Sequence, residues 1–248
     1  MEQVLLVTGG SRGIGAATAL LAAARGYAVA VNYTAHLSAA EDVVRRIRAA
    51  GGRAIAVQAD VAQEKQVLAL FEQVDRELGR LTALVNNAGV VDVPARLDEM
   101  SVARLKRMFD INVIGAMVCA REAVRRMSTR HGGSGGAIVN VSSAAARMGA
   151  PGQYLDYAAA KGAIDTFTIG LAKEVAAEGI RVNAVRPGLI ETDIHASGGL
   201  PDRVRDLAHQ VPMKRGGSAE EVAEAILWLL SPQASYTTMS LLDVSGGR

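Results

Sequence analysis

The chain has 248 residues, of which half are hydrophobic, and its 27 basic residues nearly balance 25 acidic ones. This length is enough to bury a substantial core in one large α/β domain or in two small ones. The small net charge, without a basic stripe interleaved with aromatic residues, excludes a typical nucleic-acid-binding protein, so no nucleic acid is expected as a partner.

The expected compartment follows from the cysteine count and from the apolar runs. The single cysteine, Cys119, excludes a disulfide within the chain and favours a reducing compartment. No uninterrupted apolar run approaches the roughly 20 residues of a membrane-spanning helix. The first strand-like run begins too early to leave room for a signal peptide. These observations predict a soluble cytoplasmic protein with no membrane partner.

Seven short apolar runs are typical of buried parallel strands. They lie at residues 4–8, 28–31, 54–57, 83–86, 137–141, 181–185 and 240–244. Between them run amphipathic helical patterns, the first three of which end at Gly26, Gly51 and Gly79. The alternation predicts one α/β domain over residues 1–248, a doubly wound parallel sheet flanked by helices, with a ligand crevice at the carboxyl ends of the strands.

The segment from about residue 192 to residue 217 interrupts this alternation. It contains Pro201 and Pro212 and only a short helical pattern, and Ser218 then begins a capping box for the next helix. We interpret the segment as a substrate lid beside the crevice, with an ordinary surface excursion as the alternative. His195, within it, is a candidate for contact with the substrate.

A glycine-rich stretch follows the first predicted strand, with the spacing Gly9-x3-Gly13-x-Gly15. Backbone N–H groups at the start of a helix attract a pyrophosphate, and glycines let the backbone approach it closely. A purely structural tight turn would show the same glycine pattern. The residues at the other strand ends are therefore needed to distinguish a phosphate-binding loop from such a turn.

The end of the second strand bears on the choice of dinucleotide. NAD-specific sites usually place a carboxylate there to bind the ribose 2′-hydroxyl, whereas this chain has Asn32, Tyr33 and Thr34. Arg12, in the glycine-rich stretch, could face a 2′-phosphate. The residues therefore favour NADP(H), with NAD(H) less expected.

Two further strand ends carry small or polar residues. Asp60, which precedes Val61, could accept a hydrogen bond from an adenine amino group, could cap the following helix, or could do both. Asn87, Ala88 and Gly89 follow the fourth strand, where small residues suit close packing against a cofactor.

Tyr157 and Lys161 are spaced i, i+4 and therefore share one helix face. A free tyrosine has a pKa of about 10, and a neighbouring ammonium is expected to lower it. Tyr157 could then act as a general acid or base. Ser143, after the fifth strand, could bind the same substrate oxygen, with Ser142 as the alternative. Such a Tyr–Lys pair alone is common in helices, and its weight comes from the other motifs.

In this order, the motifs resemble those of the short-chain dehydrogenase/reductase family, in particular its 3-oxoacyl-carrier-protein reductase and glucose dehydrogenase-like members. The resemblance spans essentially the whole chain and begins with Thr8, Gly9, Gly13 and Gly15. It implies a Rossmann fold and hydride transfer between a nicotinamide and a carbonyl or secondary alcohol, and therefore a small-molecule substrate of that class.

The resemblance also implies the residues of the site. The implied catalytic residues are Asn112, Ser143, Tyr157 and Lys161. Together with the strand-end residues, the expected cofactor-binding set is Gly9, Ser11, Arg12, Gly13, Ile14, Gly15, Asn32, Tyr33, Thr34, Asp60, Val61, Asn87, Ala88, Gly89, Tyr157, Lys161, Pro187, Gly188, Ile190 and Thr192. Lys161 would bind the nicotinamide ribose, Asn112 would hold a water that links Lys161 to solvent, and Thr192 would contact the carboxamide.

Two departures from the family pattern concern the substrate side. One extra residue separates Ser143 from Tyr157 and is expected to reshape the substrate wall around residues 153–156. Arg186, just before Pro187, is expected to place a charge close to the crevice.

Assembly and rival functions complete the expectations. The family usually forms homodimers or homotetramers through long helices, which here span about 101–127 and 156–177. No metal is expected, because the four histidines lack ligand-like spacing. The rival hypotheses are an NADP(H)-binding regulator or scaffold without turnover, and an epimerase or dehydratase of the related extended family.

Overall fold

Seven parallel strands form one sheet in the computed structural model, which describes residues 3–248. The strands are β1 (Gln3–Val7), β2 (Tyr27–Tyr33), β3 (Ala54–Gln58), β4 (Ala83–Asn86), β5 (Gly136–Val141), β6 (Ile180–Pro187) and β7 (Leu241–Val244). Their spatial order is β3-β2-β1-β4-β5-β6-β7, so the direction of winding reverses between β1 and β4. The predicted doubly wound sheet is confirmed, and this reversal places a crevice at the carboxyl ends of the strands.

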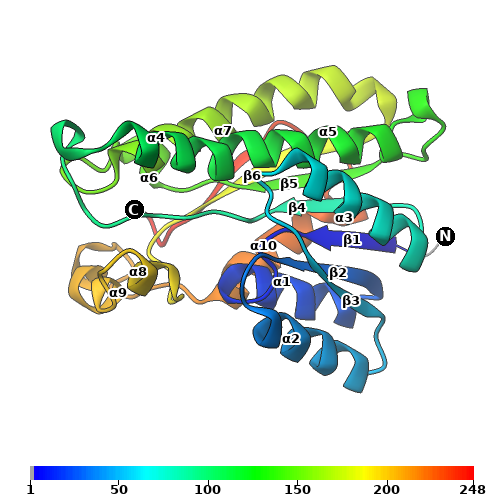
Figure 1. The fold of residues 1–248 in the computed structure, drawn as a ribbon, viewed down its shortest axis with the longest axis horizontal. Coiled ribbons are helices and arrows are strands. Elements are labelled where there is room, and N and C mark those ends of the chain that lie inside the picture. Colours follow the sequence, from blue (N-terminus) through cyan, green and yellow to red (C-terminus); the bar gives the residue numbers. More distant parts are fainter. Residues whose placement is uncertain (1–2) are drawn as a thin grey trace.

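Helices cover both faces of this sheet (Figure 1). The longer ones are α1 (Gly13–Ala24), α2 (Leu37–Ala49), α3 (Glu64–Glu77), α4 (Val102–Phe109), α5 (Ala116–Met127), α7 (Leu155–Val175) and α10 (Ala219–Leu230). The helices α1, α2 and α10 pack on one face, and α3, α5 and α7 pack on the other.

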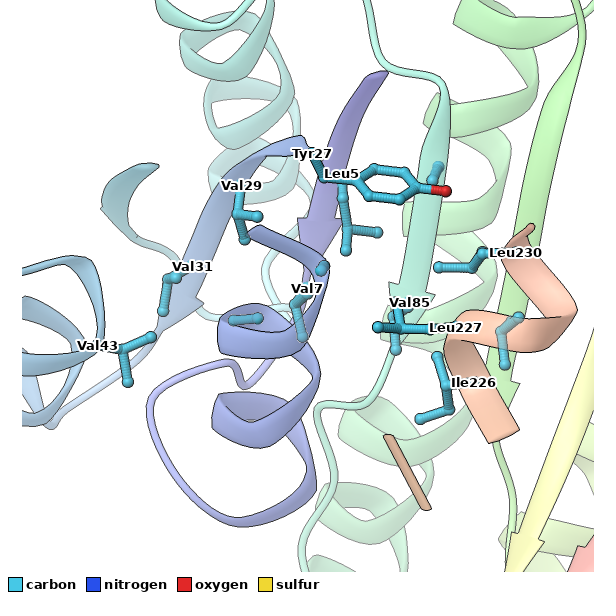
Figure 2. Packing of buried hydrophobic residues seen from close by; sticks show 14 of the residues in the cluster. Leu5, Val7, Tyr27, Val29, Val31, Val43, Val85, Ile226, Leu227 and Leu230 are labelled. Atoms are coloured by element: carbon cyan, nitrogen blue, oxygen red, sulfur yellow. The ribbon is translucent and has the colours of Figure 1, made fainter. Parts of the chain in front are cut away.

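The two cores follow from the alternation of side chains along each strand. In β1, Leu5 and Val7 belong to the core beneath α1 and α10, whereas Val4 and Leu6 belong to the opposite one. Figure 2 shows Leu5 and Val7 on the same side of the sheet as Leu227 of α10. Because both faces are covered, the strands are apolar at nearly every position, which explains the continuous apolar runs in the sequence.

The helical stretch at about 101–127 is not a single α-helix. A π-helical segment, Asp110–Gly115, separates α4 from α5 and contains the buried Asn112. A Cβ atom on Gly115 would lie 2.8 Å from the carbonyl oxygen of Val61, so the widened turn packs closely against the loop after β3. Such π segments are frequent at functional sites.

The segment at 192–217 leaves the sheet and returns to nearly the same place. It contains α8 (Ile194–Ser197), α9 (Arg203–Leu207) and a 3₁₀ turn, Ala208–Gln210. Its two ends are tied by hydrogen bonds from Glu191 N to Gly217 O and from Gly217 N to Leu189 O, both of 2.9 Å. Ser218 and Glu221 form the predicted capping box of α10. The side chain of His195 lies outside the described part of the chain.

No helix among residues 3–248 combines the length and the apolar character that crossing a bilayer requires.

Candidate active site

A cavity of about 880 Å³ opens at the carboxyl ends of the strands. Its walls come from the loops after β1 to β6, from α8 and α9, and from the short helix α6 (Ala145–Met148). Most of the expected cofactor-binding residues line this cavity, namely Gly9, Ser11, Arg12, Gly13, Ile14, Tyr33, Thr34, Asp60, Val61, Asn87, Ala88, Gly89, Tyr157, Lys161, Pro187, Gly188, Ile190 and Thr192. Residues far apart in the sequence therefore meet because their strands end at one edge of the sheet.

The glycine-rich stretch after β1 is held against the loop after β4. The Asn87 side chain donates hydrogen bonds to the carbonyl oxygens of Thr8 (3.0 Å) and Gly9 (2.9 Å). A Cβ atom on Gly15 would lie only 2.3 Å from the carbonyl oxygen of Gly9, so any side chain there would displace the backbone. The loop is thus fixed with the first turn of α1 beside the cavity, an arrangement that fits a pyrophosphate.

Asn32 and Gly15 lie behind the wall of the cavity rather than in it. Asn32 is buried at the end of β2, where its carboxamide accepts a hydrogen bond from Gly9 N (3.2 Å) and donates one to Ala59 O (2.9 Å). Asn32 therefore holds the glycine-rich stretch in place through Gly9 and does not line the cavity, whereas the sequence suggested that it contacts the cofactor.

Arg12, in the loop after β1, lines the cavity with an exposed side chain. Tyr33, Thr34 and His36, at and after the end of β2, line the same cavity. Asp60, after β3, also lines the cavity, and its Oδ1 atom accepts the backbone N–H of Ala62 (3.0 Å). The expected helix cap is wrong, because α3 begins at Glu64 with Gln63 as its N-cap, and Asp60 instead closes a turn before that helix; its contact with adenine stays a prediction.

Ser143 and Tyr157 are hydrogen-bonded through their side chains inside the cavity. Ser143 also accepts the backbone N–H of Ala145 at 3.1 Å. Ser142, the alternative, is buried and donates its hydroxyl to the carbonyl oxygen of Lys161 at 3.2 Å. Of the two serines, the structure places Ser143 against the phenol.

Burial controls the pKa of both Tyr157 and Lys161. It raises the pKa of Tyr157 to about 12, and the hydrogen bond from Ser143 opposes this rise only in part. Burial lowers the pKa of Lys161 to about 8, against the opposing charge of Asp165. The pKa of Tyr157 is therefore raised by desolvation, in the direction opposite to the expected lowering by Lys161.

The position of the ammonium group helps to explain this outcome. The Nζ atom of Lys161 lies 5.4 Å from the centroid of the Tyr157 ring and donates a hydrogen bond of 2.7 Å to the carbonyl oxygen of Val141. Lys161 is thus anchored to the end of β5, beside the ring.

Asn112 lies directly behind Gly89 and Lys161. Its carboxamide accepts a hydrogen bond from Val90 N (3.2 Å) and donates to Val90 O (3.1 Å) and Met108 O (3.0 Å). A Cβ atom on Gly89 would lie 2.8 Å from Asn112 Oδ1 and 3.5 Å from Lys161 Nζ. Asn112 is therefore near Lys161 but outside the lining of the cavity, and its water relay stays a prediction.

Arg186 precedes Pro187, which lines the cavity, but the charge expected close to the crevice is paired rather than free. Its guanidinium forms an ion pair with Oδ2 of Asp165, through hydrogen bonds of 2.8 and 3.0 Å. The side chain of Arg186 is outside the lining of the cavity. The positive charge of Arg186 on β6 is therefore balanced by the carboxylate of Asp165 on α7.

Several lining residues were not predicted from the sequence. They include Arg107, Met148, Arg203 and Arg248, whereas Gln153 and Tyr154, which also line the cavity, lie in the stretch 153–156 where a reshaped wall was expected. The extra residue before Tyr157 drew attention to Gln153 and Tyr154, but no local pattern distinguishes Arg203 or Arg248 from surface arginines.

Comparison with known proteins assigns the family. A family model described as enoyl-(acyl carrier protein) reductase matches residues 9–248. The chain belongs to the short-chain dehydrogenase/reductase family. As a member of this family, it is an oxidoreductase that uses a nicotinamide cofactor. The described residues contain no cluster of three or more potential metal ligands.

The chain is similar to other short-chain dehydrogenases/reductases over almost its whole length. An uncharacterized oxidoreductase of Escherichia coli, YgfF, is 57% identical over 245 residues, which cover 99% of both chains. A cis-4-hydroxycyclohexanecarboxylate dehydrogenase of Sinomonas cyclohexanicum is 44% identical over 249 residues, covering 99% of this chain and 96% of that protein. The crystal structure of a blue fluorescent protein from a metagenomic library, in complex with NADPH, superposes with a TM-score of 0.90, 35% identity and coverage of 99% and 97%.

Proposed function

We propose that this protein is an NADP(H)-preferring oxidoreductase that interconverts a carbonyl compound and a secondary alcohol, with Tyr157 as the general acid or base. The observation that carries the proposal is the hydrogen-bonded pair Ser143 and Tyr157 in the same cavity as the glycine-rich stretch. A reacting oxygen bound there lies within reach of a proton donor and of a second hydroxyl.

The residues of this cavity fit the cofactor. The first turn of α1 and Gly9, Ser11 and Gly13 would hold the pyrophosphate, Lys161 the nicotinamide ribose, and Thr192 the carboxamide. Arg12 would pair with the 2′-phosphate, and the NADPH complex of a similar protein supports this choice. The bound nicotinamide supplies the hydride or takes it up.

The chain itself moves the proton. With a pKa of about 12, Tyr157 holds its proton at neutral pH, which is the form that carbonyl reduction needs. Tyr157 would donate this proton to the developing alkoxide, while the Ser143 hydroxyl donates a hydrogen bond to the same oxygen. Lys161, with a pKa of about 8, can exchange a proton near neutral pH and would return one to Tyr157 through a water held by Asn112.

The Tyr157→Phe variant tests the function. The phenylalanine keeps the ring and removes the hydroxyl group that carries the proton, so turnover is expected to fall by about 10²- to 10⁴-fold while NADPH binding is retained. One relative is named a cis-4-hydroxycyclohexanecarboxylate dehydrogenase, so that acid and 4-oxocyclohexanecarboxylate belong in the first substrate panel. Near-normal kcat in Tyr157→Phe would refute the role of Tyr157.

The rival function is an NADP(H)-binding regulator or scaffold. It would be supported if the wild-type protein bound NADPH tightly but turned over no compound in a broad panel of ketones and alcohols.

We also propose that residues 192–217 act as a lid, since both ends of the segment are tied together beside the cavity. An assembly through the face formed by α4, the π segment and α5 is supported by the exposed Phe109, Ile114 and Met117. Homodimer, homotetramer and cytoplasmic location stay predictions.

A further inference from the structure

Among the described residues, four arginines line the active-site cavity together with Tyr157 and Ser143, and two of them, Arg203 and Arg248, come from the last quarter of the chain. Arg203 is the first residue of α9, and Arg248 follows β7. Figure 1 shows the C-terminal end of the chain at the same side of the sheet as α8 and α9. Two cations therefore reach the substrate side of the cavity from parts of the chain that are distant in sequence.

Arg203 is held there by neutral groups. Its Nη2 atom donates a hydrogen bond of 2.8 Å to Oε1 of Gln153, and its guanidinium lies 5.1 Å from the centroid of the Tyr154 ring. The Tyr154 side chain is buried, so this cation–π contact holds the guanidinium against a packed aromatic ring. Neither partner neutralises the charge.

Arg248 is positioned through its backbone. Its backbone oxygen atom accepts hydrogen bonds from Ser245 Oγ (2.9 Å) and Arg147 Nη2 (3.1 Å). Its guanidinium atom Nη1 is buried and has no hydrogen-bond partner among the residues that the structure describes. A buried, charged donor without a partner is costly, so an anion is the ligand that this group favours.

Two other cations of the cavity lining, Arg107 and Lys161, have partners of their own. Arg107 pairs with Asp92 at 3.4 Å, and Lys161 donates to the carbonyl oxygen of Val141. Within residues 3–248, no salt bridge to a carboxylate involves Arg203 or Arg248. Burial and the like charge of Arg203 both lower the pKa of Arg248, so the two guanidiniums are close enough to repel each other. An anion between them would relieve that repulsion.

The position in the sheet separates these arginines from the cofactor phosphates. Arg12 and the glycine-rich stretch belong to the ends of β1 and β2, whereas Arg203 and Arg248 follow β6 and β7 on the other side of the β1–β4 reversal. Tyr157 and Ser143 come from the elements after β5, between the two positive regions. An anion bound at these arginines would therefore be separated from the phosphates of the cofactor.

We propose that Arg203 and Arg248 bind the carboxylate of the substrate, so that the substrate class is oxo acids and the corresponding hydroxy acids. A planar guanidinium matches a carboxylate with two parallel hydrogen bonds. The reacting carbon lies at Tyr157, and the apolar side chains of Met148 and Ile194, which also line the cavity, face the carbon skeleton between the two ends. This inference rests on the proposed function for the location of the reacting carbon.

A binding experiment tests the carboxylate site without turnover. The protein is saturated with NADPH and titrated calorimetrically with cyclohexanecarboxylate and with its neutral amide, neither of which carries a reducible ketone. Wild-type protein is expected to prefer the carboxylate, and Arg203→Met and Arg248→Met are each expected to reduce that preference by about 10- to 100-fold. Equal affinity for acid and amide, or no binding of the acid, overturns the proposal.

Arg205→Met is the matched control. Arg205 lies on the same helix, α9, but is exposed, pairs with Asp202 at 2.9 Å and is outside the cavity lining. This variant is expected to keep the wild-type preference for the acid. An equal loss in Arg205→Met and Arg203→Met would mean a general effect of charge or of folding and would refute the site.

A kinetic comparison distinguishes this inference from the proposed function. With 4-oxocyclohexanecarboxylate and its amide, the arginine variants are expected to lose the acid-over-amide ratio of kcat/KM, mainly through KM. If the arginine-dependent binding of the acid is seen but no ketone is reduced, the site stands and the proposed function fails. If ketones are reduced with the same ratio in every variant, the function stands and the site fails.

Discussion

Lys161 Nζ lies 5.4 Å from the ring centroid of Tyr157 and is hydrogen-bonded to the end of β5. The two groups are desolvated together, and desolvation shifts them in opposite directions. The pKa of the phenol rises to about 12, and the pKa of the ammonium falls to about 8. In both residues burial therefore favours the neutral form, and Lys161 is the member of the pair that titrates near neutral pH.

The free energy of unfolding should depend on pH through the titration of the buried Lys161. Between pH 8 and pH 10.5 the unfolded chain holds more protons on residue 161 than the folded chain, so this residue makes the free energy of unfolding increase with pH. Lys161→Met removes the effect. The difference in unfolding free energy between wild type and variant is expected to move in favour of wild type by about 3 kcal/mol across this window. Urea unfolding at pH 7.5, 9 and 10, at one protein concentration, measures it, and a pH-independent difference would contradict the prediction.

Arg12 should select NADPH over NADH. In Arg12→Gln, the Kd for NADPH is expected to rise by about 10- to 100-fold, since a hydrogen-bonded charge pair is lost, while the Kd for NADH changes little. Arg25→Gln is the control, because Arg25 is exposed at the other end of α1 and pairs with Glu224. Fluorescence titration with each cofactor gives the four constants. Tighter binding of NADH by the wild-type protein would refute the role of Arg12.

Gly15 should tolerate no side chain. The added Cβ atom would lie 2.3 Å from Gly9 O and 2.6 Å from Asn87 Nδ2, and one of these contacts is with rigid backbone. Gly15→Ala is expected to lower the free energy of unfolding by about 1–3 kcal/mol and to weaken cofactor binding. Gly170→Ala in α7 meets nothing within 4 Å and is expected to be neutral or stabilising by about 1 kcal/mol. Thermal unfolding of the two variants, which carry the same substitution, checks the contrast.

The ion pair between Arg104 and Asp156 should hold the start of α7 beside Tyr157. Asp156 Oδ2 accepts from Arg104 Nε at 2.8 Å, and its Oδ1 accepts from Tyr157 N at 2.9 Å. The Asp156 side chain is fully buried and that of Arg104 is 11% exposed. Removing one member leaves the other charge unpaired, so Asp156→Ala is expected to cost about 3–5 kcal/mol.

A double variant separates this charge effect from simple loss of packing. Arg104→Leu/Asp156→Leu is expected to be less destabilised than Asp156→Ala, because it leaves no unpaired charge. Urea unfolding of both proteins measures the difference. A double variant that is the less stable of the two would show that packing, and not charge, dominates.

The sequence by itself determined the sheet and most of the cavity lining. The strands are apolar at nearly every position because helices cover both faces, and Gly26, Gly51 and Gly79 end helices through a local left-handed conformation. Since parallel strands present their carboxyl ends at one edge, a residue at the end of a strand, such as Tyr33, or just after one, such as Asn87, could be assigned to the cavity from its position in the chain alone.

Tertiary structure decided what each polar group does there. Asn32 became a support because Gly9 and Ala59 happen to lie against it, and Arg186 was neutralised by Asp165. None of these three partners is adjacent in sequence, and the desolvation that sets the pKa values of Tyr157 and Lys161 depends on everything packed around them. No sequence pattern around Arg203 or Arg248 indicates a place in the cavity. These two arginines, far apart in the sequence, come near each other only once the chain has folded.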